Sequence, residues 1–152
     1  MYLIGDIGNS EIKICLVNKK NRFIKKINFP STNLSFKNLR LNFRNLKYYL
    51  PKIEKILFCS VVPKNFKLIN KFLKTKTNVK CFEVKQLDLS SIIKIKVNYH
   101  QVGSDRITNA ISLADNKKNF IIIDLGTATS FDILIKNTYI GGIIAPGIKL
   151  SL

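Results

Sequence analysis

The sequence predicts an α/β fold with a mixed β-sheet and an internal duplication. Short apolar runs suited to strands alternate with segments in which apolar residues recur at helical spacing, as in an α/β protein. A strand that ends in a carboxylate and a glycine turn also occurs twice, near the start of the chain and again towards its end. Because the two copies share the same order of residue types, they indicate a repeat.

The repeated turn has the residue types of a phosphate-and-metal site. We match Asp6, Gly8 and Asn9 of the first copy with Asp124, Gly126 and Thr127 of the second. A buried strand delivers its carboxylate to the end of a sheet, where the charge must meet a metal, a donor or water. The glycine lets backbone N–H groups approach an anion closely.

The first two thirds of the chain predict several strands and two helices. Apolar residues from Leu39 to Leu50 recur on one face of a helix that Pro51 closes. Pro63 suits the first position of a second helix. We expect a hairpin of residues 2–6 and 11–17, and further strands at 22–29, 56–61, 79–84 and 92–97.

The last third predicts one helix and three strands. Gly103-Ser-Asp-Arg opens the helix, and the second copy of the repeat begins at Asn119. Its hairpin is followed by Thr138-Tyr-Ile and Gly141-Gly-Ile-Ile-Ala-Pro-Gly. Residues 119–152 suffice for three strands but not for helices to cover them, and an uncovered apolar sheet is unstable. We therefore expect either a shortened two-domain architecture or a partner chain that completes it.

Composition narrows the class of protein. With 152 residues, 46% of them hydrophobic, the chain is long enough for one good core or two small domains. No apolar run approaches the roughly 18 residues of a membrane helix, and the N-terminus lacks the layout of a signal peptide. We expect a cytoplasmic protein with no membrane partner. Cys15, Cys59 and Cys81 are expected to be buried free thiols, and the lone His100 excludes a His-rich metal site.

The net charge of +17 raises the alternative of a nucleic-acid partner. Almost all positive residues are lysines scattered along the chain, whereas base recognition relies on arginine and aromatic clusters. Composition therefore favours a solvated lysine surface, which can still attract an anionic substrate such as a nucleotide.

Four motifs together resemble a known family. The order and context of the type III pantothenate kinases are matched by Asp6-Ile-Gly-Asn-Ser, Gly103-Ser-Asp-Arg, Asp124-Leu-Gly-Thr-Ala-Thr and Gly141-Gly-Ile-Ile-Ala-Pro-Gly. This family is part of the acetate kinase, sugar kinase, heat-shock 70 and actin superfamily. The resemblance covers the whole chain and implies a duplicated ribonuclease-H-like (actin-like ATPase) fold with an incomplete second domain. It implies a first domain at residues 1–117 and the first three strands of a second at 118–152.

The resemblance also implies a function and its ligands. The reaction is ATP-dependent phosphorylation of pantothenate to 4′-phosphopantothenate, the first step of coenzyme A biosynthesis. The implied cofactors are ATP, Mg²⁺ and a monovalent cation, K⁺ or NH₄⁺. The implied assembly is a homodimer with the pantothenate pocket near the subunit interface.

Roles for individual residues follow from the same resemblance. Asp124 is implied as the ligand of the monovalent cation and as a residue that helps hold Mg²⁺. Asp105 is implied as the catalytic base that accepts the hydroxyl proton, a role suited to a carboxylate held at a helix N-terminus. The residues implied to bind pantothenate are Gly103, Ser104, Asp105 and Arg106. Those implied to bind ATP are Asp6, Ile7, Gly8, Asn9, Ser10, Glu11, Ile12, Lys13 and Thr127.

The segment before Gly103 departs from the family pattern. Lys96 stands where the family commonly has a tyrosine, and Tyr99 is a candidate replacement for the missing ring. The partner of Arg106 is left open between a substrate carboxylate and a phosphate. Asp105 also has a simpler interpretation, as a helix-cap carboxylate.

Two other functions compete with the kinase. Aspartic proteases also pair Asp-x-Gly turns, but the middle residue is Thr or Ser there, whereas this chain has Ile7 and Leu125. A basic nucleic-acid-binding module on a ribonuclease-H-like sheet, without kinase activity, is the stronger alternative. It predicts binding to DNA or RNA that weakens steeply as salt is added.

Overall fold

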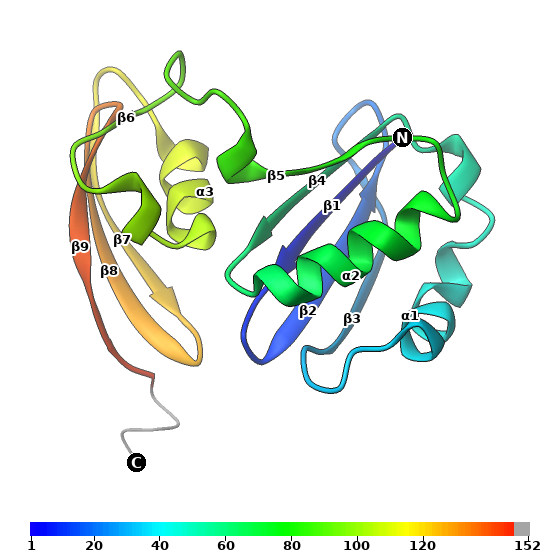
Figure 1. The fold of residues 1–152 in the computed structure, drawn as a ribbon. Helices are drawn as coiled ribbons and strands as arrows, with labels where there is room; N and C mark the ends of the chain where they lie inside the picture. Colours follow the sequence, from blue (N-terminus) through cyan, green and yellow to red (C-terminus); the bar gives the residue numbers. More distant parts are fainter. Residues whose placement is uncertain (148–152) are drawn as a thin grey trace. The chain divides into compact units, whose positions relative to one another are not determined.

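The computed structural model describes residues 1–147, which fall into two compact units (Figure 1). The first unit is Met1–Gln86 and the second is Leu87–Leu152. Within the described range, every helix is too short or too polar to cross a membrane.

A five-stranded mixed sheet forms the first unit, in the order β3-β2-β1-β4-β5. Its first three strands are antiparallel to one another, whereas β4 and β5 run parallel to β1. The mixed sheet predicted from the sequence is thereby confirmed. The strands are β1 (Tyr2–Ile7), β2 (Glu11–Val17), β3 (Phe23–Pro30), β4 (Lys55–Ser60) and β5 (Cys81–Glu83).

Two helices, α1 (Phe36–Asn42) and α2 (Pro63–Lys74), pack against this sheet (Figure 1). α2 begins at Pro63 as predicted, because proline fits the first turn, where the backbone nitrogen needs no partner. The Ser35 side chain caps α1 by accepting a hydrogen bond from the Asn38 N–H at 3.2 Å. Strands and helices enclose one core, which includes Leu3, Ile7, Ile14, Leu39, Phe43, Phe58 and Ile69.

The single helix predicted from Leu39 to Leu50 is wrong. α1 ends at Asn42, and the chain continues in short 3₁₀ turns at Phe43–Leu46 and Leu50–Lys52. The apolar residues of the pattern are buried nonetheless. The pattern therefore predicts which residues belong to the core but not the conformation of the backbone that carries them. Asparagines interrupt the segment and lack strong helix propensity, which permits tighter turns to serve the same burial.

The second unit has a four-stranded sheet in the order β6-β9-β8-β7. β7, β8 and β9 form an antiparallel meander like that of β1, β2 and β3, so the duplicated hairpin is present in both units. Helix α3 (Ser104–Leu113) packs on β7 and β8. The strands are β6 (Lys94–Ile95), β7 (Asn119–Leu125), β8 (Ala128–Ile135) and β9 (Thr138–Pro146).

The units divide the chain at a different place from the predicted domains 1–117 and 118–152. Lys94 and Ile95 pair with β9, and α3 covers β7 and β8, so residues 87–117 pack with the second hairpin. The predicted domain limits follow the repeat in the sequence and stay a prediction, whereas the compact units follow packing.

One face of the second sheet is apolar and exposed. Ile121, Ile123 and Leu125 alternate along β7 on the face opposite α3 and are 73%, 57% and 64% exposed. On the neighbouring strands, Ile133 and Ile143 are also exposed. Within residues 87–147, helix α3 packs on the other face of this sheet and leaves these side chains exposed.

Candidate active site

The first predicted phosphate loop is a tight hairpin turn between β1 and β2. Gly8 N–H donates to the Glu11 carbonyl at 3.0 Å and closes the turn. From outside the hairpin, the Ser31 hydroxyl donates to the Gly8 carbonyl at 2.5 Å, and the Ser31 N–H donates to the Ser10 carbonyl at 3.0 Å. The loop is therefore held in one conformation by a second segment of the same unit.

Side chains of the predicted loop divide into two kinds. Ile7 and Ile12 have no exposed surface and belong to the core, so any contact they make with a nucleotide is through the backbone. Asn9 and Ser10 at the tip are exposed. Asp6 is the second-last residue of β1, and its Oδ1 accepts a hydrogen bond from the Cys59 thiol at 3.4 Å.

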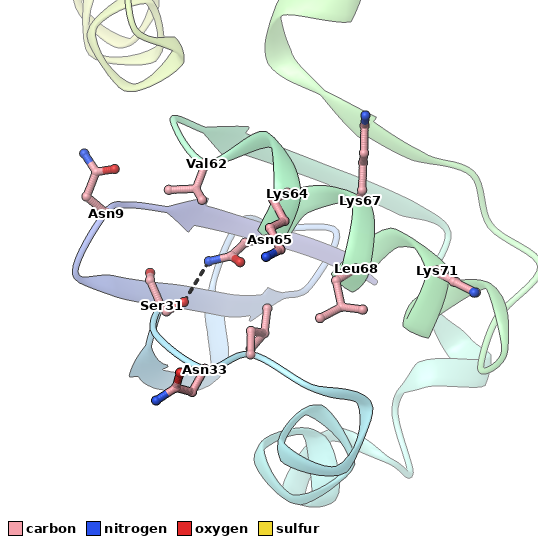
Figure 2. A pocket seen from close by; sticks show the side chains of 10 residues that line it. Asn9, Ser31, Asn33, Val62, Lys64, Asn65, Lys67, Leu68 and Lys71 are labelled. Atoms are coloured by element: carbon pink, nitrogen blue, oxygen red, sulfur yellow. Dashed lines mark hydrogen bonds between the residues drawn. The ribbon is translucent and has the colours of Figure 1, made fainter.

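A groove of about 710 Å³ opens beside this loop (Figure 2). Asn9 lines it together with Ser31, and the Asn65 amide spans its floor by donating to the Ser31 carbonyl at 2.9 Å. Helix α2 contributes positive charge to the lining through Lys64, Lys67 and Lys71. The tip of the first loop therefore faces a basic surface, which favours an anion.

The second predicted loop is also a tight hairpin turn, between β7 and β8. Gly126 N–H donates to the Ala128 carbonyl at 3.1 Å, and Thr127 at the tip is exposed. Asp124 lies on β7 two residues before Gly126, as Asp6 does before Gly8, and its carboxylate is exposed. The two carboxylates thus have the same place in their hairpins, although the second turn is shorter.

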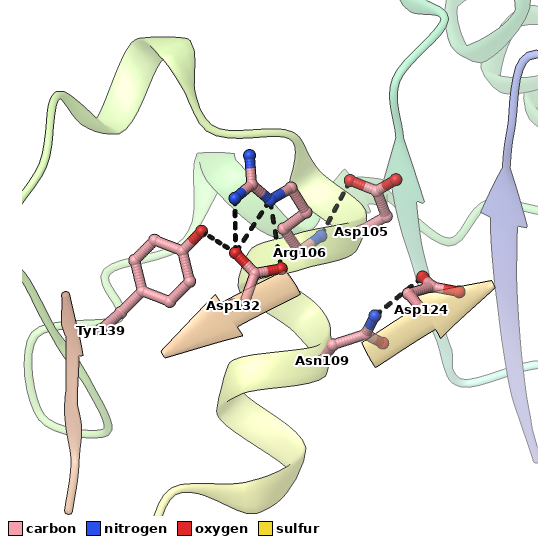
Figure 3. Close-up of polar contacts among 6 residues, drawn as sticks. All are labelled: Asp105, Arg106, Asn109, Asp124, Asp132 and Tyr139. Carbon is pink, nitrogen blue, oxygen red and sulfur yellow. Dashed lines mark hydrogen bonds and ion pairs between the residues drawn. The ribbon is translucent and has the colours of Figure 1, made fainter. Parts of the chain in front are cut away.

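Helix α3 carries Asp105 in its first turn, two residues after Gly103 at the N-cap. The Asp105 carboxylate accepts a hydrogen bond from the Arg106 backbone N–H at 2.8 Å, and the start of the helix favours its negative charge. One turn along the same helix face, the Asn109 amide donates to Asp124 Oδ2 at 3.0 Å (Figure 3). The helix therefore brings the predicted base and the predicted cation ligand to one side.

Arg106 points to the other side of α3, where it meets a buried carboxylate (Figure 3). Its Nη2 lies 2.6 Å from Asp132 Oδ1, and its Nε donates to both oxygens at 2.9 and 3.1 Å. The Tyr139 hydroxyl also donates to Asp132 Oδ1. The hydrogen bonds with Asp132 raise the pKa of Arg106, while burial and Asp132 together raise the pKa of Tyr139. Both side chains therefore stay protonated at neutral pH.

Of the remaining predicted substrate residues, Ser104 is buried and Gly103 is half-exposed. Ser104 accepts a hydrogen bond at its carbonyl from the Thr108 hydroxyl at 2.8 Å. Lys96 is exposed and pairs through its backbone N–H with the Tyr139 carbonyl at 3.0 Å. Tyr99 is half-buried in a short 3₁₀ turn, Tyr99–Gln101, and its role as a replacement ring stays a prediction.

Two glycines of the Gly141 to Gly147 motif lie where a side chain would collide with its neighbours. A Cβ atom at Gly142 would lie 2.7 Å from Asp132 Oδ1 and 2.8 Å from Arg106 Nη2. A Cβ atom at Gly147 would collide with the carbonyls of Gly126 and Thr127 in the second loop. These glycines are therefore needed for close packing, beyond the loop punctuation that the sequence alone indicates.

The residues present fit an oxygen-bound cation held at Asp124. No group of three or more His, Cys, Asp or Glu side chains that could enclose a metal occurs within residues 1–147. Magnesium is usually held by one or two carboxylates together with substrate phosphates and water, so it needs no protein cage. A single exposed carboxylate, oriented by Asn109, suits that mode of binding.

Three residues of this region were missed by sequence reasoning. Asn109 follows Asp105 by four positions, the spacing that places both on one helix face, and this was its signal. Asp132 interrupts the apolar run of residues 131–135, and a charge that is buried in such a run needs a partner. Tyr139 gave no signal, because a tyrosine is ordinary in a strand.

Solved structures resemble the chain at the level of fold. The Aquifex aeolicus Ppx/GppA phosphatase aligns with a TM-score of 0.53 at 14% identity, over 98% of this chain and 53% of that one. A candidate 2-dehydro-3-deoxygalactonokinase of Sinorhizobium meliloti aligns with a TM-score of 0.55 at 8% identity, over 95% and 53%. The predicted ribonuclease-H-like, actin-like class is thereby confirmed.

Relatives found by sequence share much higher identity with this chain than these solved structures do. The type III pantothenate kinase of Pelagibacter ubique (strain HTCC1062) is 55% identical over all of this chain and 61% of its own length. Type III pantothenate kinase 1 of Francisella tularensis subsp. tularensis (strain SCHU S4) is 37% identical, over all of this chain and 62% of its own length. The chain thus spans about three fifths of these relatives. The family model for type III pantothenate kinases matches residues 2–152, and the chain therefore belongs to the type III pantothenate kinase family.

Proposed function

We propose that this protein transfers the γ-phosphoryl group of ATP to pantothenate, giving 4′-phosphopantothenate in the first step of coenzyme A biosynthesis. The geometry that best supports the proposal is the α3 face. There Asp105 stands in the first turn, and Asn109 orients the Asp124 carboxylate one turn later. Family membership supports the choice of reaction.

Asp105 is proposed as the catalytic base, which accepts the proton of the pantothenate hydroxyl as that oxygen attacks phosphorus. Phosphoryl transfer depends mainly on positioning and on neutralisation of charge, so a fixed carboxylate of ordinary strength is adequate. The helix start favours the negative charge of Asp105, and the Arg106 backbone N–H donates a hydrogen bond to its carboxylate. Gly103, Ser104 and Arg106 are proposed to bind pantothenate around this base.

The hairpin of Asp6 to Lys13 is proposed to bind ATP phosphates. Its backbone is fixed by Ser31, so its N–H groups are preorganised for an anion. The lysines of α2 beside Asn9 add positive charge. Thr127 is proposed as a further phosphate contact from the second hairpin.

Asp124 is proposed to hold a monovalent cation, K⁺ or NH₄⁺, and to help hold Mg²⁺. When bound, such cations neutralise the phosphate oxygens. The part played by the chain itself is orientation, because the Asn109 amide fixes one carboxylate oxygen.

We further propose that the protein is cytoplasmic and forms a homodimer. The apolar face of Ile121, Ile123, Leu125, Ile133 and Ile143 supports association. Burial of apolar surface stabilises by about 25 cal/mol per Å², so exposing such a face is unfavourable. Sedimentation velocity tests this: Ile123→Lys should shift the protein towards the monomer, whereas Phe23→Lys on the exposed edge of the first unit should not.

Pantothenate-dependent release of ADP is the direct test of the kinase. The chain is assayed with ATP, Mg²⁺ and K⁺, with and without pantothenate. It is also assayed as a chimera extended by the part of the Pelagibacter relative that the match does not cover. We expect turnover only with pantothenate, and Asp105→Asn should lower kcat by about 100-fold or more. Asp88→Asn, at an exposed carboxylate that is not among the proposed site residues, is the matched control and should leave kcat unchanged.

Turnover that does not depend on pantothenate, or none in either protein, would overturn the kinase proposal. Binding to DNA or RNA that falls steeply with salt would favour the nucleic-acid module instead. The comparisons with known proteins give that alternative no support.

A further inference from the structure

Arg106 is held by a buried group that we call the arginine support, which consists of Asp132, Tyr139, Gly141 and Gly142. Asp132 and Tyr139 have no exposed surface. The Asp132 carboxylate accepts hydrogen bonds from Arg106 and from the Tyr139 hydroxyl. A buried carboxylate is costly unless it is paired and hydrogen-bonded, so these contacts define the local structure.

The backbone of β9 is shaped to make this contact. Gly141 has a φ of +122°, in the region that favours glycine, and it lies beside a register shift opposite Ile133 and Leu134. Because of this bulge, Tyr139 pairs with Leu134 and faces the same side of the sheet as Asp132. A regular strand would turn Tyr139 to the opposite face.

Gly142 supplies the space that the ion pair needs. It lies directly opposite Asp132 in the β8–β9 register. As its missing Cβ would crowd both Asp132 Oδ1 and Arg106 Nη2, any side chain here would push the pair apart. The two consecutive glycines thus have different structural roles. Gly141 forms the bulge that places Tyr139 on the same face as Asp132, and Gly142 leaves space for the Arg106 side chain.

The pairing occupies only one edge of the guanidinium. Asp132 takes Nε and Nη2, and no residue within the described part of the chain accepts a hydrogen bond from Nη1. The edge formed by Nη1 and Nη2 can bind a second carboxylate through two parallel hydrogen bonds. Arg106 directly follows Asp105, so the contacts with Asp132 hold this edge at a fixed place on the residue next to the proposed base.

We infer that Asp132 and Tyr139 are positioning residues, which fix Arg106 so that its remaining edge binds the carboxylate of the acceptor substrate. This inference rests on the proposed function, because it takes the acceptor to be a hydroxy acid such as pantothenate. Because Asp132 already pairs with Arg106, we expect the remaining edge to select a carboxylate through the geometry of two parallel hydrogen bonds. The arginine support acts only through Arg106.

Steady-state kinetics of four variants test the inference. We expect Asp132→Asn to raise the KM for pantothenate about tenfold while the KM for ATP changes less than twofold. Tyr139→Phe should raise the KM for pantothenate by a smaller factor. In an Arg106→Ala background, Asp132→Asn should have no further effect on that KM, because the residue it positions is gone.

Two outcomes would overturn the inference. One is an equal rise of both KM values in Asp132→Asn, as expected if the ion pair only stabilises the fold. The other is an additive effect of Asp132→Asn in the Arg106→Ala background. Thermal unfolding of each variant, measured in parallel, separates loss of folded protein from loss of positioning.

A readout independent of turnover separates this inference from the proposed function. In NMR spectra of ¹⁵N-arginine-labelled protein, the Arg106 Nε–H should exchange slowly with water, and Asp132→Asn should abolish that protection. Addition of pantothenate without ATP should shift this signal. If neither the chain nor the chimera shows turnover but the Arg106 signal still shifts with pantothenate, the result would contradict the kinase and support the inference. An unprotected or unshifted Arg106 signal would contradict the inference.

Discussion

Nη2 of Arg106 lies 2.6 Å from Oδ1 of Asp132, a carboxylate with no exposed surface. This pair joins helix α3 to strand β8, and the Tyr139 hydroxyl joins strand β9 to the same oxygen. The Gly103-Ser-Asp-Arg motif at the start of a helix is thus held by residues that follow Arg106 by more than two dozen positions. Stability and positioning are linked at this point of the second unit.

Substitution of Gly142 by alanine should destabilise the second unit. The added methyl group meets Asp132 and Arg106 at distances that real Cβ atoms do not adopt, so the pair or the strand must shift. We expect a loss of about 1–3 kcal/mol in the free energy of unfolding, measured with urea. Gly126→Ala is the matched control, since the nearest atom to its Cβ is 3.5 Å away. Equal effects of the two variants would contradict this account.

Tyr139 should make the protein less stable at high pH. Its pKa in the folded state is raised above the ordinary 10.0 by burial and by Asp132. A raised folded pKa means that the contribution to stability is complete below about pH 10 and is lost as the pH rises further. Tyr139→Phe lacks the ionising hydroxyl, so between pH 9 and 11 the wild type should lose more stability than this variant. Parallel pH profiles for the two proteins would refute the assignment.

Cys81 should be the least reactive thiol. Burial raises its pKa from 9.0 to about 12, so at pH 8 only about one molecule in 10,000 carries the thiolate. Reaction with Ellman's reagent at pH 8 should therefore show a slow phase that Cys81→Ser removes. Cys15→Ser is the comparison, because Cys15 is partly exposed and should account for a faster phase. A fast phase lost in Cys81→Ser would contradict the prediction.

Phe43 should be a main contributor to the core of the first unit. It is 2% exposed, and its ring lies 5.2 Å from that of Phe72 and 6.4 Å from that of Phe29. Phe43→Ala should lower the free energy of unfolding by about 3–5 kcal/mol. Phe23→Ala removes the same atoms from a side chain that is 74% exposed and should cost less than about 0.5 kcal/mol. Urea unfolding of both variants provides the comparison.

Sequence reasoning found the elements that short-range patterns specify. The Asp-x-Gly hairpins, the start of α2 at Pro63 and the start of α3 after Gly103 depend on residues within one turn of each other. Turn chemistry and capping act at that range, so they are legible in the sequence. The apolar spacing from Leu39 to Leu50 predicts the buried residues correctly, but the continuous helix that it also predicts is wrong.

The parts that could not be predicted depend on contacts between distant segments. Residues 94 and 95 pair with β9, and a strand of two residues has no sequence pattern that identifies the strand with which it pairs. The contact of Arg106 with Asp132 requires α3 to lie across β8 in one register. The position of Tyr139 depends on a bulge at Gly141, and the sequence shows only the glycine.

Strand β6 precedes α3 in the chain but forms the edge of the second sheet beside β9, the last strand. This arrangement has a practical consequence for splitting the protein into fragments. A gene cut at the start of the second repeat, near residue 118, would place β6 and α3 on the N-terminal fragment. The C-terminal fragment would then lose the strand that pairs with β9 and the helix that packs on β7 and β8. A cut between Gln86 and Leu87 keeps each sheet with its own neighbours. The unit that was copied in the sequence and the unit that folds are therefore not the same piece of chain.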